Sequence, residues 1–167
     1  MLGAEGFEPY ARVAVMARPI EGLPRAPFLP GVSVEPYRND WAEEFTEVEA
    51  AAMQGLAAFA EMGQPTGYES AEGFDAMVAA REEGAGLTGF AQAMVPEGWI
   101  NWLGVAPDAR RRGIGRLLVA ELARQVREAR GTHLAALVEA DGDGQAFLRA
   151  LGFKERGARR TLMIRRA

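Results

Sequence analysis

The hydrophobic period of this chain changes at Phe74, and that change limits the folds open to it. Downstream, short segments with the two-residue alternation of strands are interleaved with segments that have the 3.6-residue spacing of helices. The expected strands are 76–81, 87–95, 99–105, 134–138 and 161–164, and the expected helices are 113–130 and 145–151. Strands interleaved with helices predict a mixed sheet that carries helices on both faces.

The first 75 residues add two short strands and one helix to this pattern. Residues 1–38 contain six prolines, so only short strands are expected there, at 12–16 and 32–37. An amphipathic helix is expected over 41–60, because apolar residues recur there at helical spacing: Trp41, Phe45, Val48, Ala52 and Leu56. Its glutamates are expected to face solvent: Glu43, Glu44, Glu47 and Glu49. A loop with one helical turn near Ser70 should follow over 63–73.

The composition fits one globular domain and excludes several kinds of site. With 167 residues, 49% of them hydrophobic, the chain can bury a core without disulfides or metal. The absence of cysteine excludes a disulfide framework, a thiolate metal site and a cysteine nucleophile. The single histidine, His133, excludes a histidine-rich metal cage, and a surface or capping role is expected for it.

No part of the sequence indicates a membrane or an exported protein. No window approaches 18 uncharged apolar residues, and residues 1–8 lack the basic start and apolar stretch of a secretion signal. A cytoplasmic protein without a membrane partner is therefore expected.

Charge is divided unevenly along the chain. Residues 1–109 hold 5 Arg and 17 acidic residues, whereas residues 110–167 hold 14 basic and 6 acidic residues. Such asymmetry can place an anion-binding face beside an acidic one. The acidic part, which includes Glu69, Glu72 and Glu83, could attract a cationic amine, although scattered charges also simply solvate a surface.

A strand, a basic turn and a helix meet over residues 105–116. Four arginines flank two glycines there: Arg110, Arg111, Arg112, Gly113, Gly115 and Arg116. The first N–H groups of a helix have no partner within it and lie at its positive end, so this turn can hold phosphate oxygens. The spacing lacks the Gly-Lys-Ser/Thr ending of a nucleotide P-loop and the three glycines of a dinucleotide fingerprint. It favours a pyrophosphate held by backbone amides, without a catalytic metal.

Two short motifs in this region belong together. Arg110, Gly113 and Gly115 match an R/Q-x-x-G-x-G/A motif, and Gly152 and Phe153 match a Gly-Phe pair that closes the last helix. With the order of elements, they make the chain resemble the GCN5-related N-acetyltransferase (GNAT) superfamily.

The resemblance covers roughly residues 86–164 and implies an α+β fold. This fold is a three-layer α/β/α arrangement, with a GNAT-like mixed, largely antiparallel central sheet and helices on both faces. Residues 1–167 are then expected to form a single N-acetyltransferase-like domain. Its parts would be a Pro-rich N-terminal arm or extra strand (1–31), an acceptor-side half (32–98) and an acyl-CoA-binding half (99–167).

The same resemblance implies acetyl-CoA, or another acyl-CoA, as the cosubstrate, and no metal. The ligand would lie between the strand ending at Val105 and the strand ending near Val138, which splay apart in this family. Its pantetheine arm would pair with the backbone of Leu103 and Val105, and an N–H near Val105 would hold the oxyanion. The residues assigned to the cofactor are Leu103, Gly104, Val105, Arg110, Arg111, Arg112, Gly113, Ile114, Gly115, Arg116 and Asp141.

Proton transfer is less well provided for, because two family positions are filled differently. Asn101 stands where many members carry a glutamate, and Leu148 stands where many carry a tyrosine. Neither side chain can transfer a proton. Glu139 and Asp141, at the end of the second splayed strand, are the candidate bases, and Asp141 also falls where members often have an asparagine that contacts pantetheine.

Aromatic residues offer further candidates on the acceptor side. Tyr37 and Tyr68 could supply a catalytic acid or simply pack. Trp99 and Trp102 are expected to point to opposite faces of their strand.

Three functions remain open at this point. The first is an N-acetyltransferase in which a primary amine of a small molecule or protein attacks acetyl-CoA directly in a ternary complex. The second is a catalytically degenerate protein that binds acyl-CoA in a regulatory or structural role. The third, nucleic-acid binding through the arginines, is weakened by the acidity of the chain, so no nucleic acid is expected. The strand at Val13 and Val15 could also pair with a neighbouring subunit and form a homodimer.

Overall fold

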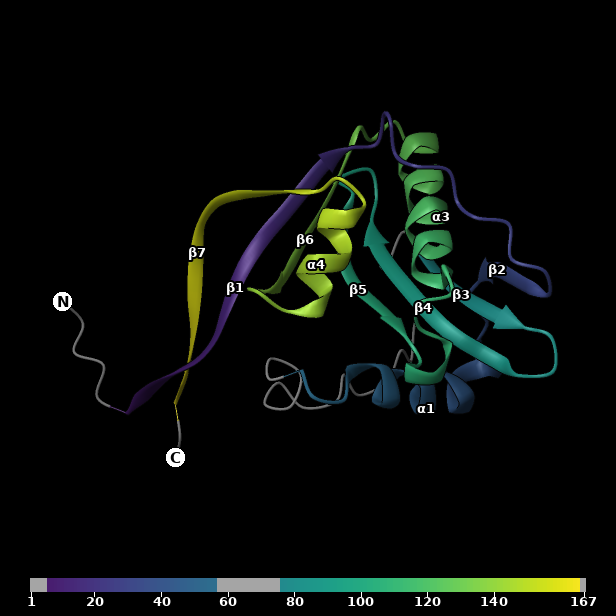
Figure 1. The fold of residues 1–167 in the computed structure, drawn as a ribbon, viewed down its shortest axis with the longest axis horizontal. Coiled ribbons are helices and arrows are strands. Elements are labelled where there is room, and N and C mark those ends of the chain that lie inside the picture. The colour runs from purple at the N-terminus through teal and green to yellow at the C-terminus, as the bar shows by residue number, and fades with distance from the viewer. Residues whose placement is uncertain (1–5, 57–75, 166–167) are drawn as a thin grey trace.

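The computed structural model describes residues 6–56 and 76–165, and they contain one seven-stranded sheet (Figure 1). The strands are β1 (Phe7–Pro19), β2 (Val32–Pro36), β3 (Ala76–Glu82), β4 (Gly86–Met94), β5 (Trp99–Val105), β6 (His133–Glu139) and β7 (Lys154–Arg165). The helices are α1 (Ala42–Met53), α3 (Ile114–Glu128) and α4 (Asp143–Ala150), with single 3-10 turns η1 (Asn39–Trp41) and η2 (Pro107–Ala109). The strand order is β2-β3-β4-β5-β6-β1-β7. Neighbouring strands are antiparallel except for the parallel pair β5 and β6.

The two faces of the sheet carry different helices. Along β3, Val78 and Ala80 belong to the core under α3 and α4, whereas Met77 and Ala79 belong to the core under α1. This alternation is the two-residue period of a strand that is buried on both faces. The predicted α+β, three-layer fold with a mixed, largely antiparallel sheet is therefore confirmed.

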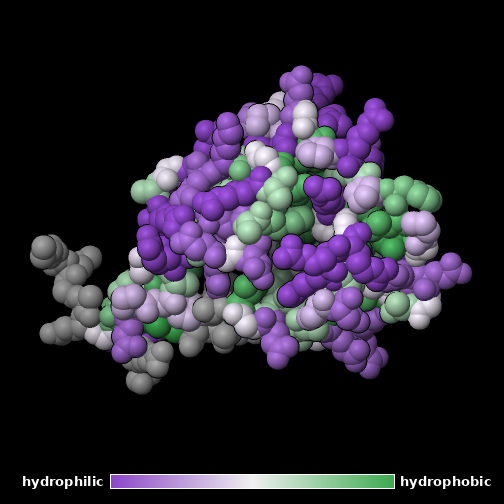
Figure 2. Space-filling model, viewed as in Figure 1, coloured by the Kyte–Doolittle hydropathy of each residue, from purple (hydrophilic) through white to green (hydrophobic). Residues whose placement is uncertain are grey.

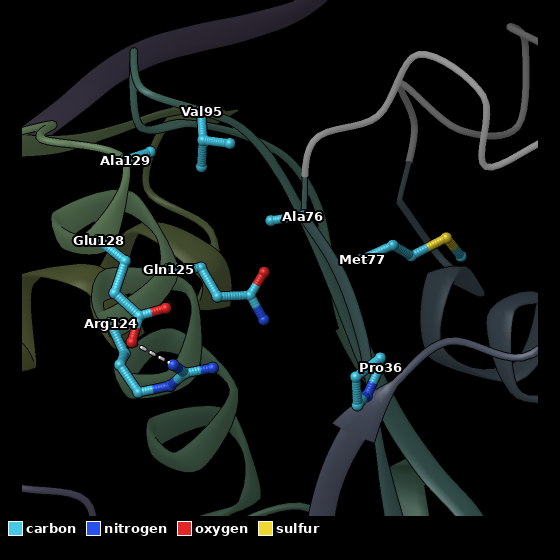
Figure 3. A pocket seen from close by; sticks show the side chains of 8 residues that line it. All are labelled: Pro36, Ala76, Met77, Val95, Arg124, Gln125, Glu128 and Ala129. Atoms are coloured by element: carbon cyan, nitrogen blue, oxygen red, sulfur yellow. Dashed lines mark hydrogen bonds and ion pairs between the residues drawn. The ribbon is translucent and has the colours of Figure 1, made fainter.

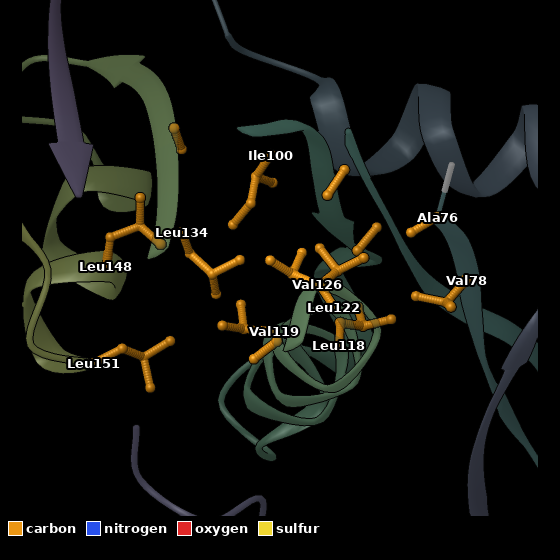
Figure 4. Close-up of a cluster of buried hydrophobic side chains, with 14 of the residues drawn as sticks. Ala76, Val78, Ile100, Leu118, Val119, Leu122, Val126, Leu134, Leu148 and Leu151 are labelled. Carbon is orange, nitrogen blue, oxygen red and sulfur yellow. The ribbon is translucent and has the colours of Figure 1, made fainter. Parts of the chain in front are cut away.

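The larger core lies between α3, α4 and the sheet (Figure 4). From α3 it takes Leu118, Leu122 and Val126, which are all fully buried and recur at helical spacing. Each such side chain contributes about 1.5–3 kcal/mol when it leaves water. These contacts fix α3, and with it the basic turn at its N-terminus, on the sheet.

The N-terminal arm is more regular than its prolines predicted. Instead of a short strand at 12–16, β1 runs from Phe7 to Pro19. Its prolines are tolerated because Pro9 lies at a register shift and Pro19 at the strand's end. Val13 and Val15 pair with β6 and β7 of the same chain, so this stretch is not an open edge for a neighbouring subunit.

The helix predicted over 41–60 is shorter in the structure. It ends at Met53, because Gln54 leaves the helical region (φ −57°, ψ 129°) and Gly55 has a positive φ of 84°. The predicted residues 57–60, and the loop with a turn near Ser70, lie outside the described residues.

One face of the molecule shows how polar and apolar residues are distributed on its surface. The face shown in Figure 2 is largely hydrophilic, with hydrophobic residues in smaller areas between the charged ones. The helices of residues 6–56 and 76–165 include none with the length and apolar character needed to cross a membrane.

Candidate functional site

The parallel strands β5 and β6 separate shortly after they meet. They pair only at Trp99 with Ala135 and at Ile100 with Ala136. Beyond Ile100 the described part of β6 offers β5 no ladder partner, so Leu103 and Val105 border an opening in the sheet. This is the splay that the family resemblance implied.

The register of β5 turns backbone groups toward that opening. Ala106 N–H donates to the Thr88 carbonyl of the neighbouring chain segment at 2.9 Å. Successive residues of a strand direct their N–H and C=O groups to opposite edges. Leu103 and Val105 therefore face away from β4 and toward the gap, where an extended ligand could pair with them.

A bulge near Asn101 sets this register and corrects one prediction. The pairing with β4 shifts between Ile100 and Trp102, so that Asn101 is the extra residue. Trp99 and Trp102 consequently lie on the same face of the sheet, the α1 face, instead of on opposite faces.

The turn before α3 has the backbone form expected of an anion site. Arg111 has φ 64° and Gly113 has φ 98°, so two left-handed residues flank Arg112. Positive φ is uncommon for a residue with a side chain and clusters at ligand sites. Within the described residues, the N–H groups of Arg111 to Gly113 have no backbone partner, and the first amides of α3 follow them. Alternating backbone conformations of this kind form nests that bind anions.

The two glycines of the motif meet protein atoms. A Cβ at Gly113 would lie 2.8 Å from Cγ of Pro27, and a Cβ at Gly115 would lie 3.0 Å from Cζ of Phe147. Gly113 thus admits the N-terminal arm and Gly115 admits the ring from α4. Both glycines are therefore required by packing within the protein itself.

The four arginines of the turn divide into two pairs. Arg110 donates to the carbonyls of Val105 (3.1 Å) and Ala52 (2.9 Å). Arg112 forms an ion pair with Glu82, at 2.9 Å between Nη1 and Oε2, and the Arg112 guanidinium lowers the pKa of Glu82.

Arg111 and Arg116, by contrast, have no side-chain partner within the described residues. Arg111 is exposed and Arg116 is exposed as well. These two side chains are therefore the ones available to an anion at the turn.

Asp141, one of the two candidate bases, is held in an ion pair. Arg159 donates to both of its carboxylate oxygens, at 2.7 and 3.0 Å, and these hydrogen bonds lower the pKa of Asp141. Its N–H donates to the side-chain oxygen of Gln145 at 2.8 Å. Asp141 thus joins the start of α4 to β7. Glu139, the other candidate, is the half-buried last residue of β6, opposite Val13.

The two departures from the family pattern occupy different surroundings. Asn101 is exposed on β5, whereas Leu148 is 2% exposed and packs in the core of α3 and α4. Tyr37 packs edge-on against Phe45, and burial raises the pKa of Tyr37. Tyr68 lies outside the described residues.

His133 takes the surface position expected of it, where Nδ1 lies 2.9 Å from the Thr132 hydroxyl.

The α1 face contributes a carboxylate that the sequence prediction placed in solvent. Glu49 is 5% exposed, and Trp102 Nε1 donates to its Oε1 at 2.5 Å. Glu44 is also not free in solvent, since it accepts the Leu87 N–H at 2.6 Å. The helical spacing contained the signal, because Glu49 follows the buried Phe45 by four residues.

A separate cavity of about 490 Å³ lies between α3 and the strand β3, away from the residues predicted to bind the cofactor (Figure 3). Its walls are Pro36, Ala76, Met77, Val95, Arg124, Gln125, Glu128 and Ala129. No three His, Asp or Glu side chains in the described ranges are grouped to hold a metal ion.

Comparisons with known proteins agree with this geometry. The family model described as "Acetyltransferase (GNAT) domain" matches residues 73–155, about half of the chain. Among curated proteins, no sequence matches. Solved structures do match, at 19–20% identity for those named next, which indicates a shared fold.

One similar structure is a GCN5-related N-acetyltransferase from Sphaerobacter thermophilus (TM-score 0.64, 19% identity). The match covers 95% of this chain and 52% of the Sphaerobacter chain. A second is AAC(6')-Iy in complex with the bisubstrate analogue CoA-S-monomethyl-acetylneamine (TM-score 0.62, 20% identity, 81% of this chain and 98% of its own). A third is the ribosomal-protein-S18-alanine N-acetyltransferase from Escherichia coli (TM-score 0.58, 20% identity, 75% and 79%). The chain spans about half the length of the first of these.

Proposed function

The chain belongs to the GCN5-related N-acetyltransferase superfamily, and from this premise we propose that it transfers an acetyl group from acetyl-CoA to a primary amine. The amine belongs to a small molecule or a protein and attacks directly in a ternary complex. Residues 1–167 act as one domain, with 32–98 on the acceptor side and 99–167 on the cofactor side.

One observation carries the proposal: β5 and β6 separate beyond Ile100, directly beside the turn at Arg111 to Gly113. The opening gives a pantetheine arm an edge of β5 that has no partner strand, at Leu103 and at the N–H of Val105, while the Val105 carbonyl accepts from Arg110. The turn gives a pyrophosphate a group of amides at a helix N-terminus, with Arg111 and Arg116 beside it. A long ligand with an anionic end and an amide-bearing arm fits both features at once.

Most of the proposed chemistry depends on a backbone group and on positioning, and little of it on side chains. The Val105 N–H would donate to the thioester carbonyl and stabilise the oxyanion that develops there. Holding the amine and thioester together supplies much of the remaining rate. Glu139 and Asp141 are the candidate bases, directly or through water, and Asp141 would have to leave its ion pair with Arg159 to act.

The class of acceptor is supported by two features. The acceptor side is acidic, which favours a cationic amine. Two of the similar structures concern amines of different size, an analogue of acetylneamine and an alanine of a ribosomal protein.

A turnover assay tests the proposal. Purified protein with acetyl-CoA should release free thiol when a panel of polyamines, aminoglycosides and peptides is added, and the acetylated amine should appear by mass spectrometry. Val105→Pro removes the proposed donor and should lower kcat about a hundredfold. Its melting temperature and coenzyme A affinity are measured alongside, and an unchanged kcat in a folded variant would reject the oxyanion role.

A second candidate, a degenerate acyl-CoA-binding protein, is favoured by the exposed Asn101 and the buried Leu148. It predicts that coenzyme A binds but that no amine of the panel is acetylated. The nucleic-acid reading predicts no response to coenzyme A at all.

A further inference from the structure

Arg110 is tied to two carbonyl groups that belong to different parts of the molecule. Its Nε donates to Val105 O at 3.1 Å, where β5 ends, and its Nη2 donates to Ala52 O at 2.9 Å, in the last turn of α1. The second bond joins residues 58 positions apart. One guanidinium therefore bridges β5 and α1.

The bridge meets a need of α1. The last carbonyls of a helix have no partner within it, and this end carries the negative end of the helix dipole. The last turn of α1 contains no basic residue of its own. Arg110 supplies both the hydrogen-bond donor and the positive charge from another element.

The packing beneath the bridge is close. A Cβ at Gly104 would lie 3.0 Å from Cβ of Ala52 and 2.5 Å from Cζ of Phe90. The end of α1 thus rests directly on β5, one residue before Val105. The small residues Gly104 and Ala52 make this approach possible, and the Arg110 guanidinium binds the two elements at the edge of the contact.

We propose that Arg110 is a positioning residue that fixes the C-terminal end of α1 onto the end of β5. It thereby holds the acceptor-side helix α1 at a constant distance from β5, the strand proposed to bind the cofactor. Phosphate binding at the turn is left to the backbone amides, Arg111 and Arg116. The proposal rests on the proposed function for its catalytic consequence, because only an acetyltransferase needs the amine and the thioester held in one geometry.

The test compares Arg110→Ala and Arg110→Lys with Arg116→Ala. Amide hydrogen exchange is measured over residues 50–54, without any ligand. Arg110→Ala should speed exchange there by about tenfold, the effect of losing a charge-assisted hydrogen bond. Arg110→Lys, whose single ammonium can reach one carbonyl, should fall between Arg110→Ala and the parent, and Arg116→Ala should match the parent.

Coenzyme A binding and turnover complete the comparison. Coenzyme A affinity, titrated between about 50 and 200 mM salt, should stay within about threefold of the parent in Arg110→Ala, with the same salt dependence. Arg116→Ala should weaken binding and flatten the salt dependence. In turnover, Arg110→Ala should lower kcat about tenfold with little change in the KM for acetyl-CoA, and Arg110→Lys should recover part of it.

Two results would overturn the proposal. One is unchanged exchange over residues 50–54 in Arg110→Ala. The other is a loss of coenzyme A affinity and of salt dependence equal to that of Arg116→Ala, which would make Arg110 a phosphate ligand. If the parent protein neither binds coenzyme A nor acetylates any amine, the proposed function fails. The exchange measurement still shows whether Arg110 holds α1 on β5.

Discussion

At the scale of single residues, Gly104 lies where β5 is closely packed against Phe90 and the end of α1. A side chain there would press on Phe90 Cζ at 2.5 Å and on Ala52. Gly104→Ala is expected to lower stability by about 1–3 kcal/mol through overpacking, measured by urea unfolding. Gly144, in α4, is the matched control, since its nearest neighbour would be 3.8 Å away. Gly144→Ala should leave stability unchanged or raise it by up to about 1 kcal/mol, and equal losses in both variants would contradict the packing argument.

Arg112 tests whether a charge in the turn before α3 acts on a ligand or within the protein. Its guanidinium pairs with Glu82 across 30 residues. Arg112→Glu places two carboxylates together and should weaken coenzyme A binding at least tenfold. The double variant Glu82→Arg with Arg112→Glu restores the pair. Recovery of affinity in it, by calorimetry, would show that Arg112 holds the turn in place, whereas persistent loss would show a direct contact with phosphate.

At the scale of elements, the junction from β6 through α4 to β7 depends on charge. Arg159 lowers the pKa of Asp141 and of Glu155 by hydrogen bonding to each. Carboxyl groups with a lowered folded pKa stabilise the protein above their unfolded pKa of about 4 and lose that contribution as pH falls through the folded values. Melting temperature should therefore fall below about pH 4, and Arg159→Gln should lower it at pH 7 and flatten the acid slope. Arg160→Gln, which removes an exposed charge from the same strand, should reproduce neither change.

The junction of β5, the turn and α3 could be predicted from sequence because its signals are local. Alternating residues up to Val105, Pro107 after them and Gly113 before a helical period give the strand, the stop and the helix start in order. The length of β1 could not be predicted, because its strand form comes from pairing with β6 and β7, over 110 positions away, as in Pro19 with His133. The prolines within it favoured only a short strand, at 12–16.

At the scale of the whole molecule, binding of coenzyme A should raise the free energy of unfolding. If coenzyme A binds only the folded chain, saturation to 100 times Kd adds about 2.7 kcal/mol to unfolding, and the melting temperature rises with concentration. Gly113→Trp should abolish the shift, because a side chain there meets Pro27 and forces a positive φ of 98° on a bulky residue. A full shift in that variant would mean that the ligand binds away from this turn.

The backbone around the candidate site could be predicted, whereas the partners of its side chains could not. The turn at Arg111 to Gly113 joins a strand to a helix, as the sequence pattern predicted, and β5 separates from β6, as the family resemblance implied. The contacts of Arg110 with Ala52, and of Glu49 with Trp102, join segments more than 50 residues apart. Such pairs depend on how α1 lies on the sheet, and no local pattern encodes that.

The place of β1 has a consequence for how the molecule assembles. β1 lies between β6 and β7, so its ladder cannot form until those two strands, more than 110 residues further along, exist. Contacts of such high sequence separation make folding slow, because a long loop must close before they form. During synthesis β1 waits unpaired while the middle of the sheet forms, and deletion of residues 6–19 would leave β7 with no neighbour to join.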